Sequence, residues 1–219
     1  MGGLRSRDQS KTDMAGDDAT LRADHPTLRR LRRALAERPG ALASDDGSPR
    51  RAAVAVVLRQ TDERRIELLL IKRSERADDP WSGHVALPGG RFDPEDATLQ
   101  DTAVRETREE TGVDLAADGL VLGTLDELRP RTPSLPPIIV TPYVAIVRPD
   151  VSIHTSDEVA AAFWVTLDSL ADPASTMEAE VTARGNTWRV PSYQVSGYTV
   201  WGMTERILRN LIGLLADSA

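Results

Sequence analysis

Three glutamates with helical spacing are the side chains of this sequence best suited to chemistry. Glu106, Glu109 and Glu110 stand at positions i, i+3 and i+4, so on a helix their carboxylates share one face about 100° wide. Carboxylates so close together repel each other unless a cation lies between them, and oxygen ligands of this kind suit Mg²⁺ or Mn²⁺. The spacing predicts a metal site. The alternative is an exposed helix with surface pairs such as Arg105 with Glu109.

The surrounding sequence predicts the elements that position these glutamates. A helix is expected over 99–111, with Gly112 ending it. Just upstream, Gly89-Gly90 allow the backbone to pass close to the site, where a carbonyl could complete a coordination shell. Runs rich in Val, Leu and Ile predict strands near 52–59, 66–73, 120–125, 138–147 and 162–165, and a hairpin over 177–190.

Helices are expected at both ends of the ordered chain, over 24–37 and 199–216. Asp24 or Thr27 would cap the first of them. Strands that flank one central helix, with helices at both ends, indicate a mixed α/β (α+β) layered fold. Residues 1–20 are polar and predict a flexible tail, and residues 21–219 predict a single domain.

Composition excludes several kinds of site and partner. The 219 residues include no cysteine, which excludes disulfides, zinc–thiolate sites and cysteine nucleophiles. The apolar runs are too short to span a bilayer, and the N-terminus has no apolar signal region, so we expect a cytoplasmic protein without membrane contact. A net charge of -7 makes nucleic acid an unfavourable partner. The arginines of 29–33 form either a phosphate contact or a solvated helix face.

The segment from Gly90 to Val113 resembles the signature of the Nudix hydrolase family. In that signature a glycine precedes a glutamate, and the run Arg-Glu-apolar-any-Glu-Glu-any-Gly-apolar follows. Here Arg105, Glu106, Glu109 and Glu110 occupy the second half, with Gly112 and Val113 after them. There are three departures: Asp96 replaces the first glutamate, eight residues instead of seven separate it from Arg105, and Thr107 occupies an apolar position.

A closer resemblance is to the coenzyme A pyrophosphatase branch of this family. The matching residues are Leu69-Leu70, Arg73-Ser74, Gly83, Leu87-Pro88-Gly89-Gly90, Asp93-Pro94 with Asp96, and Val200-Trp201-Gly202-Met203-Thr204. The spacer from Ser74 to Gly83 is one residue longer than in that branch. An arginine of the branch is missing, and Asp78 or Asp79 stands in its place. An aspartate there would repel a phosphate, which weakens the assignment of coenzyme A.

The resemblance implies an α/β/α sandwich with a mixed sheet and a catalytic loop–helix. It also implies Mg²⁺-dependent (or Mn²⁺-dependent) hydrolysis of a pyrophosphate by water. Glu106, Glu109, Glu110 and the Gly90 carbonyl would bind the metal, and Arg105 would orient a carboxylate. The general base would be one of these glutamates or, from a later loop, Glu158, which could equally be a solvated acid.

The expected substrate is a small nucleoside diphosphate derivative, first of all coenzyme A or an acyl-CoA, giving 3′-phosphoadenosine 5′-phosphate and (acyl-)phosphopantetheine. Its alternatives are ADP-ribose, NADH, dinucleotide polyphosphates or (d)NTPs and, from another class, a non-catalytic nucleotide- or RNA-binding module. Substrate contacts are expected from a further set of residues, each of which could equally be an ordinary surface or loop residue. They are Arg73, Arg76, Gly83, His84, Gly89 and Arg91. The assembly, which could be a homodimer, is left open by the sequence.

Overall fold

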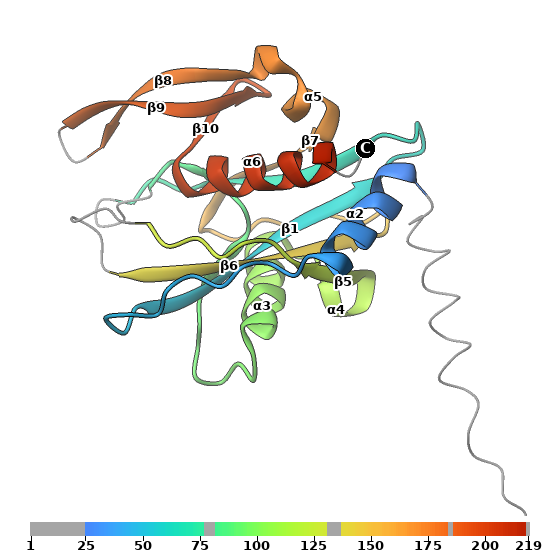
Figure 1. The fold of residues 1–219 in the computed structure, drawn as a ribbon, viewed down its shortest axis with the longest axis horizontal. Coiled ribbons are helices and arrows are strands. Elements are labelled where there is room, and N and C mark those ends of the chain that lie inside the picture. Colours follow the sequence, from blue (N-terminus) through green and yellow to red (C-terminus); the bar gives the residue numbers. More distant parts are fainter. Residues whose placement is uncertain (1–24, 77–81, 131–136, 184–185, 218–219) are drawn as a thin grey trace, which may run out of the picture.

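A mixed seven-stranded sheet forms the centre of the molecule (Figure 1). The computed structural model describes residues 25–76, 82–130, 137–183 and 186–217, so the expected tail over 1–20 lies outside them, as do Asp78 and Asp79. The strand order is β3-β2-β1-β6-β5, with β4 beside β1 and β7 beside β2. The strands are β1 (Arg50–Gln60), β2 (Ile66–Arg73), β3 (Val85–Ala86), β4 (Gly89–Arg91), β5 (Gly119–Thr124), β6 (Ile138–Val147) and β7 (Val159–Thr166). Only β1 and β6 pair in parallel among these strands of the described chain.

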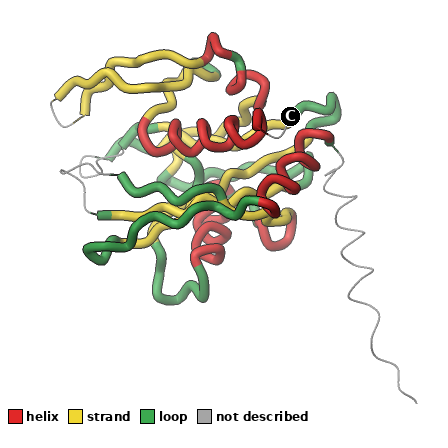
Figure 2. The backbone as a smooth tube through the Cα atoms, in the orientation of Figure 1, coloured by secondary structure: helices red, strands yellow, loops and turns green. Residues whose placement is uncertain are grey.

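Helices cover both faces of this sheet, which confirms the expected α/β/α sandwich (Figures 1 and 2). The helices are α2 (Pro26–Glu37), α3 (Leu99–Thr111), α4 (Leu115–Asp118), α5 (Leu167–Ala171), a 3₁₀ turn (Pro173–Ser175) and α6 (Gly202–Asp217). One face packs against α3 and α4, and the opposite face packs against α2 and α6. Beyond α6 lies a second, three-stranded antiparallel sheet of β8 (Thr176–Ala183), β9 (Asn186–Val195) and β10 (Tyr198–Trp201).

The side-chain alternation of β1 explains how the layers form. Successive side chains of a strand point to opposite faces, so Ala53, Ala55 and Val57 pack in the apolar cluster under α3, while Val56 and Leu58 pack in the cluster under α2 and α6. All five are fully buried. The small alanines leave room for α3 to lie close to the strand that carries its neighbours in the site.

The expected helix over 99–111 is confirmed at both ends. The side chain of Thr98 caps it by accepting a hydrogen bond from the Asp101 N–H. Gly112 ends it in the left-handed conformation, with φ of 73°. The bounds of β2 and β6 are those expected from the sequence, 66–73 and 138–147.

The outer helices differ from expectation at their N-terminal ends. The last helix begins at Gly202 and not at residue 199, because residues 198–201 pair with β9 as strand β10. The apolar side chains of residues 198–201 continue the helical pattern of the sequence, but the backbone of these residues pairs with β9. The first helix begins at Pro26 and not at residue 24, and His25 caps it by accepting from the Thr27 N–H. Within the described residues no helix is long and apolar enough to cross a membrane.

Candidate active site

A gap between β1 and β2 brings Gly89 and Gly90 beneath α3, where they begin β4 after a bend at Pro88. The segment from Pro88 to Gly90 is called the turn below. The two strands pair with each other only at residues 58–60 of β1, and farther along β1 pairs with β4 while β2 pairs with β3. The Ala55 N–H donates to the Pro88 carbonyl at 2.8 Å, so the turn fills this gap. Gly89 has a φ of +150°, and a Cβ there would lie 2.3 Å from the Ala53 carbonyl oxygen. Only glycine fits such a close passage of two backbones.

Glu110 is buried against this turn. Its side chain is 5% exposed, and its Oε2 accepts a 2.8 Å hydrogen bond from the Gly89 N–H. Burial raises the pKa of Glu110 to about 7, and the charges of Glu106 and Glu158 add to the rise. The Gly89 N–H and Arg73, whose Nη1 lies 3.7 Å from Oε1, oppose it. Glu110 is therefore a buried acid whose charge is only partly balanced.

Glu106 lies directly against Gly90. A Cβ on Gly90 would stand 2.3 Å from the carboxyl carbon of Glu106, so the two are in contact across the turn. Burial is the main cause that raises the pKa of Glu106, and the charges of Glu109 and Glu158 contribute to it. Glu106 and Glu110 thus share one partly dry region beside two consecutive glycines.

Arg105 joins three carboxylates. Its Nε and Nη2 each donate a 3.0 Å hydrogen bond to Asp96, and its Nη1 donates to Glu106 at 2.8 Å and to Glu109 at 3.2 Å. The hydrogen bonds from Arg105 lower the pKa of Asp96 to about 2. Arg105 therefore makes both kinds of contact that the two interpretations require, a hydrogen bond to Glu106 and the i, i+4 pair with Glu109.

The pairing with Asp96 explains two departures from the family signature. Asp96 lies at the end of a tight turn in which its N–H donates to the Asp93 carbonyl and its Oδ2 accepts from the Asp93 N–H. The longer loop therefore brings the shorter side chain within reach of Arg105. Thr102, which sequence reasoning did not single out, donates to the same Oδ2 at 2.7 Å. Thr102 lies one helical turn before Glu106, and this position is the feature of the sequence that could have pointed to it.

Thr107, the third departure, is fully buried. Its hydroxyl donates to the Ala103 carbonyl at 2.7 Å, one turn back along α3. A polar side chain can occupy an apolar position when its donor is satisfied inside the helix. The departure therefore leaves no unpaired buried group at Thr107.

The carboxylates of the candidate site are the type of ligand that a hard divalent cation prefers. Glu106 and Glu110 offer only oxygen, and burial leaves them with repelling charges that a cation would offset. Glu109 is different, because its side chain is 56% exposed and shares the Arg105 nitrogen with Glu106. Within the described residues no three acidic or histidine side chains are grouped closely enough to hold an ion as they stand.

Glu158 lies in the turn just before β7, at the edge of the same region. Its side chain is 53% exposed and pairs with Arg76, whose Nη1 is 3.1 Å from Oε1. The backbone around it is tied to the site, since the Ser74 N–H donates to the Glu158 carbonyl and the Ser156 N–H donates to the Glu110 carbonyl. The charge of Glu158 contributes to the raised pKa of both Glu106 and Glu110. The fold thus brings this acid, distant in the sequence, close to α3.

The other expected substrate residues lie on the strands and loops around the turn. The Arg73 N–H donates to the His84 carbonyl, and the His84 ring lies 4.5 Å from the Trp201 ring, a contact that sequence reasoning did not anticipate. Gly83 adopts a φ of +71° in the loop before β3. Arg91 is exposed at the end of β4, and its carbonyl accepts a long hydrogen bond from Arg105. Of the six expected residues, Gly89 and Arg73 lie against Glu110, Arg76 pairs with Glu158, and Arg91 is tied to Arg105 through its carbonyl. Gly83 lies beside Glu75, and His84 lies beside Trp201.

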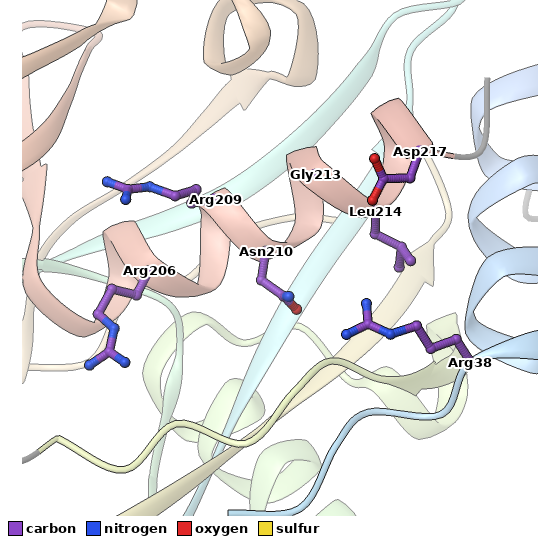
Figure 3. Close-up of a pocket in the computed structure, with 7 residues that line it drawn as sticks. All are labelled: Arg38, Arg206, Arg209, Asn210, Gly213, Leu214 and Asp217. Atoms are coloured by element: carbon purple, nitrogen blue, oxygen red, sulfur yellow. The ribbon is translucent and has the colours of Figure 1, made fainter.

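A separate hollow of about 400 Å³ lies along α6 (Figure 3). Its lining consists of Arg38, Arg206, Arg209, Asn210, Gly213, Leu214 and Asp217. Arg38 is paired with Asp126 and Arg209 with Glu205, so most of this positive charge is already balanced. The hollow contains none of the residues expected to do chemistry, and the candidate active site remains the turn beneath α3.

Comparison with known proteins agrees with this geometry. Residues 49–184 match the family model described as NUDIX domain. A protein of Cronobacter sakazakii, described as an uncharacterized Nudix hydrolase NudL, is 38% identical over 74% of this chain and 81% of its own length. Its namesake in Klebsiella pneumoniae is 39% identical over 66% of this chain and 72% of its own length.

Solved structures share the fold at lower identity. The Ap4A hydrolase of C. elegans, solved as a binary complex, gives a TM-score of 0.52 at 19% identity, over 77% of this chain and 98% of its own. A NUDIX hydrolase from Alicyclobacillus acidocaldarius also gives 0.52 at 19% identity, over 75% of this chain and 91% of its own. At this identity the likeness concerns the fold.

Proposed function

Because the chain belongs to the Nudix family of hydrolases, we propose that it cleaves the pyrophosphate bond of coenzyme A or an acyl-CoA. The products would be 3′-phosphoadenosine 5′-phosphate and (acyl-)phosphopantetheine. The observation that carries the hydrolase assignment is the pair formed by the buried Glu110 and the partly buried Glu106 beside Gly89-Gly90. Two repelling carboxylates on the inner face of α3 suit a site that uses a cation to act on an anionic substrate.

Glu106, Glu109, Glu110 and the Gly90 carbonyl would hold Mg²⁺, or Mn²⁺ in its place. When bound, the ion neutralises phosphate oxygens and lowers the pKa of a water molecule. Arg105, held by its two bonds to Asp96, would keep Glu106 oriented toward the ion. Asp96 and Arg105 are thus positioning residues for the carboxylates of α3.

Hydrolysis adds one water molecule across the pyrophosphate. The water oxygen bonds to one phosphorus, the bond from that phosphorus to the bridging oxygen breaks, and the bridging oxygen leaves with the second phosphate. Glu158 is the proposed base that takes the proton from the water, because it borders the buried carboxylates and is itself solvated. Glu106, Glu109 or Glu110 is the alternative base.

Arginines around the turn provide the phosphate contacts in this proposal. Arg73 and Arg91 lie at the ends of β2 and β4, and Arg76 lies just beyond β2. Arg73 is beside Glu110, and Arg76 is beside Glu158. Guanidinium groups pair with phosphate oxygens in a two-point geometry. Gly83, His84 and Gly89 complete the proposed wall, with the His84 ring supported by Trp201.

Coenzyme A is favoured by the branch-specific residues around Arg73-Ser74 and Val200-Trp201-Gly202. The aspartates at 78 and 79, where that branch carries an arginine, favour instead a substrate such as ADP-ribose, NADH or a (d)NTP. In either case the partner is a small nucleoside diphosphate derivative. The non-catalytic alternative is disfavoured because binding without a metal gives no reason to bury mutually repelling carboxylates.

A substrate panel tests the proposal. The purified protein is incubated with Mg²⁺ and coenzyme A, acetyl-CoA, ADP-ribose, NADH or dNTPs, and products are identified by mass spectrometry. We expect 3′-phosphoadenosine 5′-phosphate from coenzyme A, and none from the Glu110→Gln variant. Cleavage of ADP-ribose without cleavage of coenzyme A would exclude the proposed substrate. No cleavage of any pyrophosphate would exclude the hydrolase.

A further inference from the structure

Arginines lie against all four acids of the candidate site. Arg105 bonds to Glu106 and Glu109, Arg73 lies beside Glu110, and Arg76 pairs with Glu158. Arg73 and Arg76 are also among the groups expected to meet substrate phosphates. The same guanidinium cannot keep its carboxylate and take up a phosphate in full. Some of these pairs must therefore change when a substrate enters.

We propose that Arg76 exchanges partners, pairing with Glu158 in the free protein and with a substrate phosphate in the complex. The proposal rests on the proposed hydrolase function, since Glu158 is the base that the exchange releases. While it is paired, Glu158 shares its oxygen Oε1 with Arg76. After the exchange that oxygen is free to accept the proton of the attacking water.

The Arg76 pair is the one of the three best suited to exchange. Both of its side chains are about half exposed, at 51% and 53%. Exposed pairs contribute little to stability, so breaking one costs little. Arg105, by contrast, is held by two bonds to Asp96, and Arg73 is 26% exposed beside a buried acid.

The backbone on both sides of the pair is held in place, so the exchange needs only a side-chain movement. The Ser74 N–H and hydroxyl donate to the carbonyls of Glu158 and Asp157. The Arg76 N–H donates to the Ser82 hydroxyl at 2.7 Å. Glu158 therefore stays at the site after its partner leaves.

Charge gives the direction of the exchange. A pyrophosphate carries at least two negative charges and offers several oxygens to a guanidinium, whereas Glu158 offers one charge. The charge of Glu158 acts on Glu106 and Glu110, so it would also act on a phosphate bound beside those two acids. Glu158 and the phosphate compete for Arg76.

A binding cycle tests this competition without any turnover. Imidodiphosphate, a pyrophosphate analogue that the reaction cannot cleave, is titrated calorimetrically into the parent, Glu158→Gln, Arg76→Gln and the double variant, all with the same Mg²⁺ concentration. We expect Glu158→Gln to bind the analogue about two- to fivefold more tightly than the parent, as expected for loss of an exposed pair. In the Arg76→Gln background the same substitution should give a much smaller gain.

An equal gain in both backgrounds would overturn the exchange, because it would mean that Glu158 only repels the phosphate through space. No gain, or no binding of the analogue by the parent, would also overturn it. Arg189→Gln and Glu180→Gln serve as the matched control, since they break another exposed pair on β8 and β9. Both should bind the analogue like the parent. Turnover is a separate result, so an intact binding cycle without any turnover would reject the hydrolase function and leave the exchange of Arg76 standing.

Discussion

Arg105 and Asp96 form a two-point ion pair in which Nε and Nη2 each lie 3.0 Å from a carboxylate oxygen. The remaining nitrogen of Arg105 donates to Glu106 and Glu109. Asp96 therefore acts on the α3 carboxylates through Arg105. This relationship joins the loop before α3 to the face of the helix that carries Glu106 and Glu109.

Replacing Asp96 should slow the reaction, although Asp96 is a positioning residue and is not expected to contact the substrate. In Asp96→Asn one charge-assisted bond is lost and Arg105 is free to turn toward Glu106 and Glu109. We expect kcat to fall by about ten- to a hundredfold, the effect typical of residues that orient metal ligands. Asp93→Asn is the control, because its amide oxygen can still accept from the Glu95 N–H in the same turn. Equal losses in both variants would mean that the turn, and not the Asp96–Arg105 pair, matters.

Glu110 should make the stability of the metal-free protein depend on pH. Its folded pKa of about 7 lies above the ordinary value of 4.5, so between these values the folded state holds a proton that the unfolded state releases. Stability from this group is present below pH 4.5 and is lost as pH rises through 7, by up to roughly 2–3 kcal/mol. This contribution is measured by urea unfolding of the parent and of Glu110→Gln at pH 5 and at pH 8, in the presence of a metal chelator.

The difference between the two proteins isolates Glu110 from other titrating groups. We expect the parent to lose more stability than Glu110→Gln between the two pH values. Mg²⁺ at pH 8 should restore stability to the parent and much less to the variant, because a bound cation offsets the buried charge. Parallel pH profiles would contradict the burial of an ionised Glu110.

The two glycines of the turn should respond differently to alanine. At Gly90 the three atoms nearest the new Cβ all belong to the movable carboxylate of Glu106, so the fold should persist while kcat falls by at least about tenfold. At Gly89 it meets the Ala53 carbonyl and the backbone of Val54 at a φ of +150°, so stability should fall by more than about 2 kcal/mol. Thermal unfolding and steady-state kinetics of Gly90→Ala and Gly89→Ala compare the two. An active Gly90→Ala enzyme would show that Glu106 can work from another position.

Thr107 should be replaceable by valine. Its hydroxyl bonds only to the Ala103 carbonyl, so valine keeps the shape and leaves no donor unpaired. We expect the free energy of unfolding to change by less than about 1 kcal/mol. Activity should be retained, as measured by kcat/KM on the substrate identified in the panel. A large loss of activity in Thr107→Val would assign the hydroxyl a role in the site.

The sequence by itself determined helix α3, its Gly112 end and the strands β2 and β6, because these depend on local periodicity and on local backbone preferences. The spacing of Glu106, Glu109 and Glu110 along that helix likewise needed no tertiary information. The sequence pattern predicts that the last helix begins at residue 199, three residues before the observed start of α6. Residues 198–201 form strand β10 because they pair with β9, and a local sequence pattern does not report that pairing.

Only the tertiary structure decided how the charges meet. The gap between β1 and β2 brings Gly89-Gly90 under Glu106 and Glu110, and the turn before β7 brings Glu158 to the same place. Burial also makes the glutamates differ, since the Glu110 side chain is nearly inaccessible to solvent while the Glu109 side chain is exposed. Residue spacing cannot give these outcomes, because the balance of burial and charge depends on which distant segments pack together.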